Sequence, residues 1–236
     1  MANEETVVRR QFIVSAAGIS AGLILGPHAA HAKKPASAKQ QPEEDVSPIE
    51  DLMREHGILR RLVLVYREVI HRIETNAEVK PDLIAQAAQI IRAFVEDYHE
   101  RDEEEFIFPR FKKAGKLTDL VDTLLQQHQA GRRLTANIQR LATASGIGST
   151  SGRQEMARTM SEFIRMYEPH AAREDTVLFP AFDQLIGEKE LHKLQELFEQ
   201  KEQALPTGNF EKMVAEVEKL EQSLGIYDLA QFTAKS

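Results

Sequence analysis

Apolar residues recur at every third or fourth position along most of the chain after residue 47, with charged residues between them. This periodicity places the apolar side chains on one face of a helix. It predicts helices over residues 48–76, 81–106, 118–143, 153–178, 188–204 and 208–223. No segment alternates apolar and polar residues as a strand does, so the sequence predicts an all-α protein. Four long helices with short connections favour an up-down four-helix bundle, followed by two extra C-terminal helices.

Local signals set the predicted helix boundaries. Ser47-Pro48 is typical of an N-cap followed by the first helical position. Pro109 and Pro180 are expected to end the second and fourth helices, because proline lacks the backbone N–H that a helix interior requires. Glycine and serine are enriched in residues 146–152, which predicts a flexible loop.

The first 32 residues have the features of an export signal. Arg9-Arg10 precedes an apolar stretch over residues 12–26, which is too short to span a bilayer, and Ala30-His31-Ala32 is a small-x-small cleavage site. The Arg-Arg-x-Phe pattern resembles the twin-arginine signal, whose pathway exports folded proteins. We therefore expect a periplasmic or otherwise exported protein with no stable membrane insertion after cleavage. A general secretory signal or an uncleaved anchor is the alternative.

The rest of the chain divides by composition into three parts. Residues 33–47 lack an apolar period and are predicted to form a disordered linker. Residues 48–185 are predicted to form the bundle, and residues 186–236 a C-terminal helical extension. The mature protein is thus expected to hold one duplicated bundle rather than two domains.

Composition and charge then limit the chemistry. The chain of 236 residues has a net charge of -7 and no cysteine. The excess of acid argues against nucleic-acid binding, which needs a basic surface for the phosphates. The absence of cysteine excludes disulfides, thiol nucleophiles and iron–sulfur clusters. Any metal must therefore be held by histidine, aspartate and glutamate.

One histidine motif occurs twice along the chain. The pattern H-x-x-x-E followed by Phe-Pro-x-Phe starts at His99 and again at His170, 71 residues later. Upstream, His56 and His128 are each followed by Arg-Arg-Leu at the same spacing, with an offset of 72 residues. The bundle is therefore predicted to consist of two duplicated helical hairpins. Each hairpin carries one histidine on its first helix and H-x-x-x-E on its second.

This repeat predicts a site for two metal ions. Residues four apart on a helix lie on the same face about 6 Å apart, so each H-x-x-x-E pair can reach one metal centre. The candidate metal ligands are His56, His99, Glu103, His128, His170 and Glu174. Four imidazoles and two carboxylates fit two ions, with each carboxylate bridging and one position per ion open for a small ligand. Such ligation points to non-haem iron more than to structural zinc, which prefers closed tetrahedral sites.

These residues resemble the ligand set of the hemerythrin-like, HHE cation-binding family over roughly residues 48–185. The resemblance implies a four-helix bundle with a bridged centre of two non-haem iron ions that binds oxygen, nitric oxide or peroxide. Oxygen-carrying hemerythrins of invertebrates use five histidines with one glutamate and one aspartate, whereas this repeat supplies four histidines. We therefore expect a more symmetric and more reactive centre than one for simple reversible oxygen carriage.

Two other functions are compatible with the same sequence. One is a metal-binding protein without turnover, which stores or senses iron or another cation. The other is an interaction module with a vestigial site, in which helices within residues 188–223 dock a partner. A single H-x-x-x-E is more often an i,i+4 pair on a helix surface, and its duplication is what favours metal ligation.

The remaining histidines and acids near the motif are not expected to be ligands. His71 and His192 have no histidine counterpart in the other hairpin, and His71 lies about 22 Å along its helix from the nearest candidate ligand. Glu104, Glu105 and Asp175 are interpreted as solvated acids beside the ligands.

Overall fold

The computed structural model describes residues 46–206 and 208–234, and the regular structure in these ranges is entirely helical. The prediction of an all-α fold is thereby confirmed. The predicted export signal and nearly all of the predicted linker lie outside the described residues. Within the described ranges, no helix is both long enough and apolar enough to cross a membrane.

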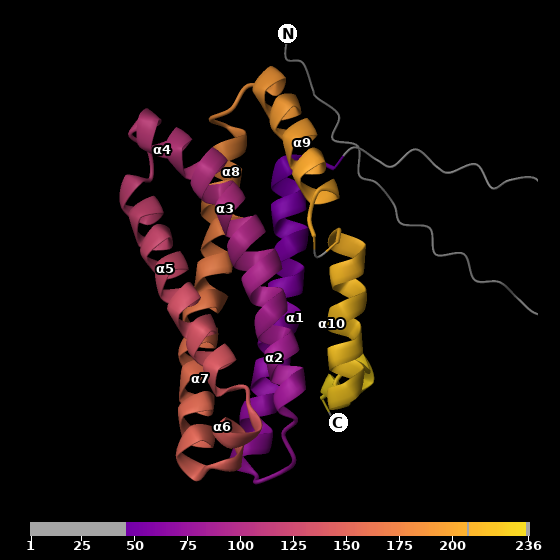
Figure 1. Cartoon of the computed structure of the whole chain (residues 1–236). Coiled ribbons are helices and arrows are strands. Elements are labelled where there is room, and N and C mark those ends of the chain that lie inside the picture. The colour runs from indigo at the N-terminus through magenta and orange to yellow at the C-terminus, as the bar shows by residue number, and fades with distance from the viewer. Residues whose placement is uncertain (1–45, 207, 235–236) are drawn as a thin grey trace, which may run out of the picture. The chain divides into compact units, whose positions relative to one another are not determined.

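Four long helical runs form the bundle (Figure 1). The first run is α1 (Pro48–Glu74) and the third is α5 (Thr118–Leu141). The second run comprises α2 (Pro81–Ile90), η1 (Ile91–His99), α3 (Glu100–Asp102), η2 (Glu103–Ile107) and α4 (Phe108–Ala114). The fourth comprises α7 (Thr150–Arg173), η3 (Glu174–Leu178) and α8 (Phe179–Asp183). The segments η1, η2 and η3 are π-helical. Helix α7 packs against α1 and α5, and α5 also packs against α2.

Helix α1 begins at the predicted residue. The Ser47 hydroxyl accepts the backbone N–H of Glu50 at 3.1 Å, and Pro48 occupies the first helical position. Both features satisfy or remove donors that a helix start leaves unpaired. The first histidine of the repeat is thereby held two turns into a well-anchored helix.

The structure corrects the predicted ends of the second and fourth helices. Both runs continue through Pro109 and Pro180, as far as residues 114 and 183. Before each proline the helix widens into a π-helical turn, where the N–H of the preceding phenylalanine bonds to the carbonyl of Glu103 or Glu174. The proline then occupies the second position of a new helical segment. A backbone N–H at that position would have no acceptor within the segment, so proline costs no hydrogen bond there.

The predicted loop at residues 146–152 is also partly helical. A short helix, α6 (Ala144–Gly148), precedes α7, and Ser149 caps α7 by accepting the N–H of Gly152 at 3.1 Å. Ser149 therefore acts as a helix cap, a role for which serine is also preferred, while Gly146, Gly148 and Gly152 lie within the two helices.

Two C-terminal helices cover the bundle. Helix α9 (Glu188–Gln203) buries Phe198 against a cluster that includes the four phenylalanines of the Phe-Pro-x-Phe motifs. Helix α10 (Phe210–Leu224) packs along α1 and buries Val217 in the main core. A 3₁₀ turn, η4 (Leu229–Phe232), follows. The two extra helices expected from the sequence are therefore present and packed on the bundle.

Candidate metal centre

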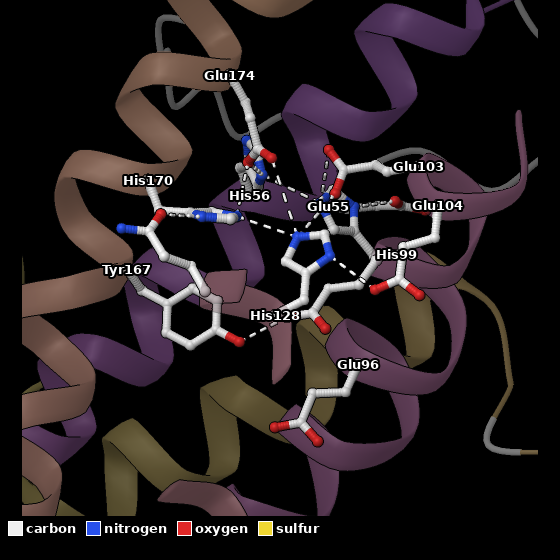
Figure 2. Close-up of polar contacts among 12 residues, drawn as sticks. Glu55, His56, Glu96, His99, Glu103, Glu104, His128, Tyr167, His170 and Glu174 are labelled. Carbon is white, nitrogen blue, oxygen red and sulfur yellow. Dashed lines mark hydrogen bonds and ion pairs between the residues drawn. The ribbon is translucent and has the colours of Figure 1, made fainter. Parts of the chain in front are cut away.

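The six predicted ligands meet inside the bundle (Figure 2). All four helical runs contribute: His56 from α1, His99 and Glu103 from the second run, His128 from α5, and His170 and Glu174 from the fourth run. Each of the six side chains is buried, with at most 3% of its residue surface exposed. The structure thus brings together every residue that the repeat selected.

The four imidazoles form two pairs. Nε2 of His56 lies 3.0 Å from Nε2 of His99, and Nε2 of His128 lies 3.2 Å from Nε2 of His170. With one carboxylate each, these pairs make two sets of side chains that could hold an ion. We call His56, His99 and Glu103 the first group, and His128, His170 and Glu174 the second group.

Each imidazole is held through its other ring nitrogen, Nδ1. The acceptors are Asp175 for His56 at 2.7 Å, Glu55 for His99 at 2.7 Å, Glu104 for His128 at 2.9 Å, and Gln127 for His170 at 2.8 Å. An acceptor at Nδ1 favours the tautomer that carries its proton there. The Nε2 lone pair is then free and points to the centre.

Phenylalanines of the Phe-Pro turns pack on two of the imidazoles. Phe179 stacks on His56 with ring centroids 5.6 Å apart, and Phe108 stacks on His128 at 5.4 Å. Each phenylalanine comes from the hairpin opposite to that of its histidine. The two halves of the repeat therefore fix each other's imidazoles.

Glu103 and Glu174 lie between the two groups. Glu174 Oε2 is 3.1 Å from Nε2 of His170 and 3.3 Å from Nε2 of His56. The Glu103 oxygens are 3.4 Å from Nε2 of His128 and 3.9 Å from Nε2 of His99. Each carboxylate thus faces one imidazole of each group, which is the placement that a bridging ligand needs.

Burial and neighbouring charges shift the pKa values of the two carboxyl groups in opposite directions. Burial, together with the nearby Glu174, raises the pKa of Glu103 well above its usual value. Glu174 is equally buried, but the imidazoles of His170 and His56 outweigh burial and hold its pKa well below the usual value. Burial also lowers the pKa of His99, which favours the neutral imidazole that binds a metal.

These features fit a pair of cations. None of the four oxygens of Glu103 and Glu174 has a hydrogen-bond partner in the structure, although all are buried. Buried carboxylates and converging lone pairs are unfavourable unless positive charge lies among them. Donors bound to one ion at about 2.1 Å lie roughly 3 Å apart, close to the Nε2 separation in both groups. A donor set of nitrogen and oxygen suits iron, manganese or zinc.

The structure contradicts the interpretation of Glu104 and Asp175 as solvated acids. Both are only partly exposed, and both accept a hydrogen bond from a candidate ligand. An arginine of the Arg-Arg-Leu motif pairs with each of them, Arg132 with Glu104 and Arg60 with Asp175. Glu105, by contrast, is exposed as expected.

His71 and His192 lie outside the centre, as the repeat predicted. Both are exposed, and His192 pairs with Glu196 on its own helix.

Comparison with known proteins assigns the family. The sequence matches the family model of the hemerythrin HHE cation binding domain over residues 47–182 and again over residues 119–225. The chain belongs to the hemerythrin HHE family. It is 44% identical over 196 residues to uncharacterised proteins of Mycobacterium bovis and Mycobacterium tuberculosis, a match that covers 81% of this chain and 76% of each relative. No solved structure matches the chain. Membership of the hemerythrin family supports cation binding at the centre described above.

Beside the hemerythrin centre, Tyr167 fills a space that a glycine leaves open. Its hydroxyl donates to Glu100 at 2.5 Å, and its ring meets His170 edge-on with centroids 5.4 Å apart. A Cβ at Gly131 on α5 would overlap the phenol. The glycine therefore allows Tyr167 to lie against the second group.

We expect Gly131→Ala to destabilise the protein by about 1–3 kcal/mol, because Tyr167 must move and lose its bond to Glu100. This cost outweighs the roughly 1 kcal/mol by which alanine is normally favoured over glycine in a helix. Urea unfolding measures the difference. Gly57→Ala on α1 is the matched control, since no atom lies within 4 Å of its added Cβ, and it should be neutral or stabilising. Equal effects in the two variants would contradict the role given to Gly131.

Proposed function

We propose that this protein is a non-haem di-iron protein that binds or reacts with oxygen, peroxide or nitric oxide outside the cytoplasm. One observation carries the proposal. Four imidazoles direct Nε2 to one centre while polar acceptors hold Nδ1, and two buried carboxylates without hydrogen-bond partners lie between them. Metal binding is the function that this arrangement serves best.

The chain's own residues would hold the ions and limit access to them. Glu103 and Glu174 would bridge, so that the protein gives each ion two nitrogens and two oxygens. Iron commonly takes up to about six donors, so positions for a small ligand remain. Bound iron would supply the redox chemistry and the open coordination positions. The apolar bundle would exclude bulk water.

A cavity of about 390 Å³ lies in the gap between α1 and α7. Leu59, Val63, Tyr167 and Ala171 form part of its mostly apolar lining, which also includes Arg60, Arg61 and Glu168. Ala171 follows His170 directly, and the Tyr167 ring contacts that histidine. A small neutral ligand could occupy this mostly apolar space beside the second group.

The location outside the cytoplasm rests on the sequence of residues 1–32. Arg9-Arg10 and the apolar stretch that follows support twin-arginine export, which carries folded proteins. Such a route suits a protein whose metal is enclosed in a finished bundle. Fractionation of cells that produce the full chain tests this point, and a wholly cytoplasmic protein would contradict it.

Metal analysis with optical spectra under argon and under air tests the centre. We expect about two iron ions per chain and a visible charge-transfer band in the oxidised form. The reduced protein is then mixed rapidly with oxygen, hydrogen peroxide or nitric oxide. A reversible adduct indicates carriage, and consumption of peroxide indicates detoxification. A loaded protein that responds to none of the three would contradict the proposal and support storage or sensing.

A further inference from the structure

The two groups of ligands are surrounded differently. We infer that the first group, at His56 and His99, retains its ion, and that the second group, at His128 and His170, holds the exchangeable ion. The inference rests on the proposed metal centre and adds which of its two ions leaves first.

The difference lies in the atoms that accept the Nδ1 hydrogens. In the first group both acceptors are carboxylates, Asp175 and Glu55. In the second group one acceptor is the carboxylate of Glu104, but the other is the amide oxygen of Gln127. Glu55 and Gln127 directly precede the first histidine of their hairpins. The duplicated unit therefore carries an acid in one copy and its neutral isostere in the other.

A carboxylate at Nδ1 strengthens the imidazole as a metal donor. It draws the Nδ1 proton toward itself and adds negative charge near the ion, and changes of such partners typically alter metal affinity by about 10–100-fold. The bonds from His99 to Glu55 and from His170 to Gln127 are similar, at 2.7 and 2.8 Å, so charge rather than geometry separates the groups.

A cavity independently distinguishes the second group. Its volume is about 230 Å³, it lies between α5 and α7, and its lining includes both His170 and Gln127. Gln127 is partly exposed, whereas Glu55 is only 4% exposed. Water or a chelator can therefore approach the side of the centre that has the weaker donor.

Extraction of iron by a chelator tests the inference on the full chain. The protein is loaded with Fe²⁺ under argon and mixed with an excess of a chromophoric chelator, and release is followed by absorbance. We expect two phases of similar amplitude, with rates that differ roughly tenfold or more. Gln127→Glu should slow the fast phase, and Glu55→Gln should speed the slow phase, each by about tenfold.

Two variants provide matched controls for charge. Gln126→Glu adds the same charge one residue from Gln127 but at an exposed position, and Glu105→Gln removes an exposed acid two residues from Glu103 in the sequence. Neither should change either phase. Equal changes in the control and test variants would overturn the inference, because general electrostatics would then explain the rates.

Anomalous scattering from wild-type crystals identifies the ion that remains after the fast phase. The expected position is beside His56 and His99, and this measurement does not depend on any variant folding correctly. A remaining ion beside His128 and His170, or release in a single phase, overturns the inference and leaves the metal centre intact. A chain that takes up no iron overturns both the inference and the proposed function.

Discussion

Glu174→Ala is expected to remove most of the bound metal from both groups. One Glu174 oxygen faces an imidazole of each group, at 3.1 Å from His170 and 3.3 Å from His56, so its loss deprives both ions of a donor. Loss of a direct ligand should exceed the effect of changing an outer partner, which implies affinity weaker by roughly a hundredfold or more. Metal analysis after gel filtration measures the occupancy.

Two further variants show whether the loss is specific. Glu103→Ala should lower occupancy in the same way, because Glu103 also faces both groups. His71→Ala, on the same helix as His56 but exposed, should retain full occupancy. If both glutamate variants kept all of their iron, the bridging assignment would be wrong. If each lost a single ion, the carboxylates would be terminal ligands instead.

The repeat predicted the candidate ligands because helical spacing within one chain segment is a local property. Residues four apart, such as His99 and Glu103, share a helix face whatever the rest of the fold does. Duplication then separated them from His71 and His192, which have no counterpart. The all-α fold and the two C-terminal helices followed from the same periodicity.

The acceptors at Nδ1 could not be recognised in this way, because half of them lie in the other hairpin. Asp175 bonds to His56 across 119 positions of sequence, and Glu104 bonds to His128 from the opposite half. Spacing along one helix does not say which side chains of another helix it meets. The repeat nevertheless contains a signal, since each acid directly follows a candidate ligand in both copies.

The π-helical turns were missed for a different reason. Pro109 and Pro180 normally end helices, and the sequence offers no local sign that the preceding turn widens. In both runs the widened turn begins at a candidate ligand, Glu103 or Glu174. The widened turns thus coincide with candidate ligands, and single π-helical turns are frequent at functional sites.

The symmetry expected from the ligand set does not extend to the residues that hydrogen-bond to the ligands. The six candidate ligands are matched between hairpins, but Glu55 corresponds to Gln127 in the repeat. An expectation based on ligands alone therefore overlooks the difference in charge that their partners impose.

Glu103→Leu is expected to make the metal-free protein more stable, by about 1–4 kcal/mol, although it damages the metal site. Glu103 is fully buried, and neither of its carboxylate oxygens accepts a hydrogen bond. Replacing a buried ionisable group by an apolar one of similar volume is often neutral or stabilising by this amount. Urea unfolding of both proteins in the presence of a strong chelator measures the difference.

The pH dependence and the response to iron together identify the cause. Burial raises the pKa of Glu103 in the folded metal-free chain, whereas a glutamate in the unfolded chain has a pKa of about 4.3. The folded chain therefore binds the carboxyl proton of Glu103 more tightly than the unfolded chain does. The wild type therefore loses stability as the pH rises from about 4.3 toward the raised pKa of Glu103. The stability advantage of the leucine variant should grow over the same pH range.

Added Fe²⁺ should reverse the order of stability, because a ligand at about a thousand times its Kd stabilises the wild type by roughly 4 kcal/mol. A leucine variant less stable than metal-free wild type would mean that Glu103 supports the fold itself. The expected reversal would mean that the bundle carries an unfavourable buried carboxylate because a metal ion compensates for it.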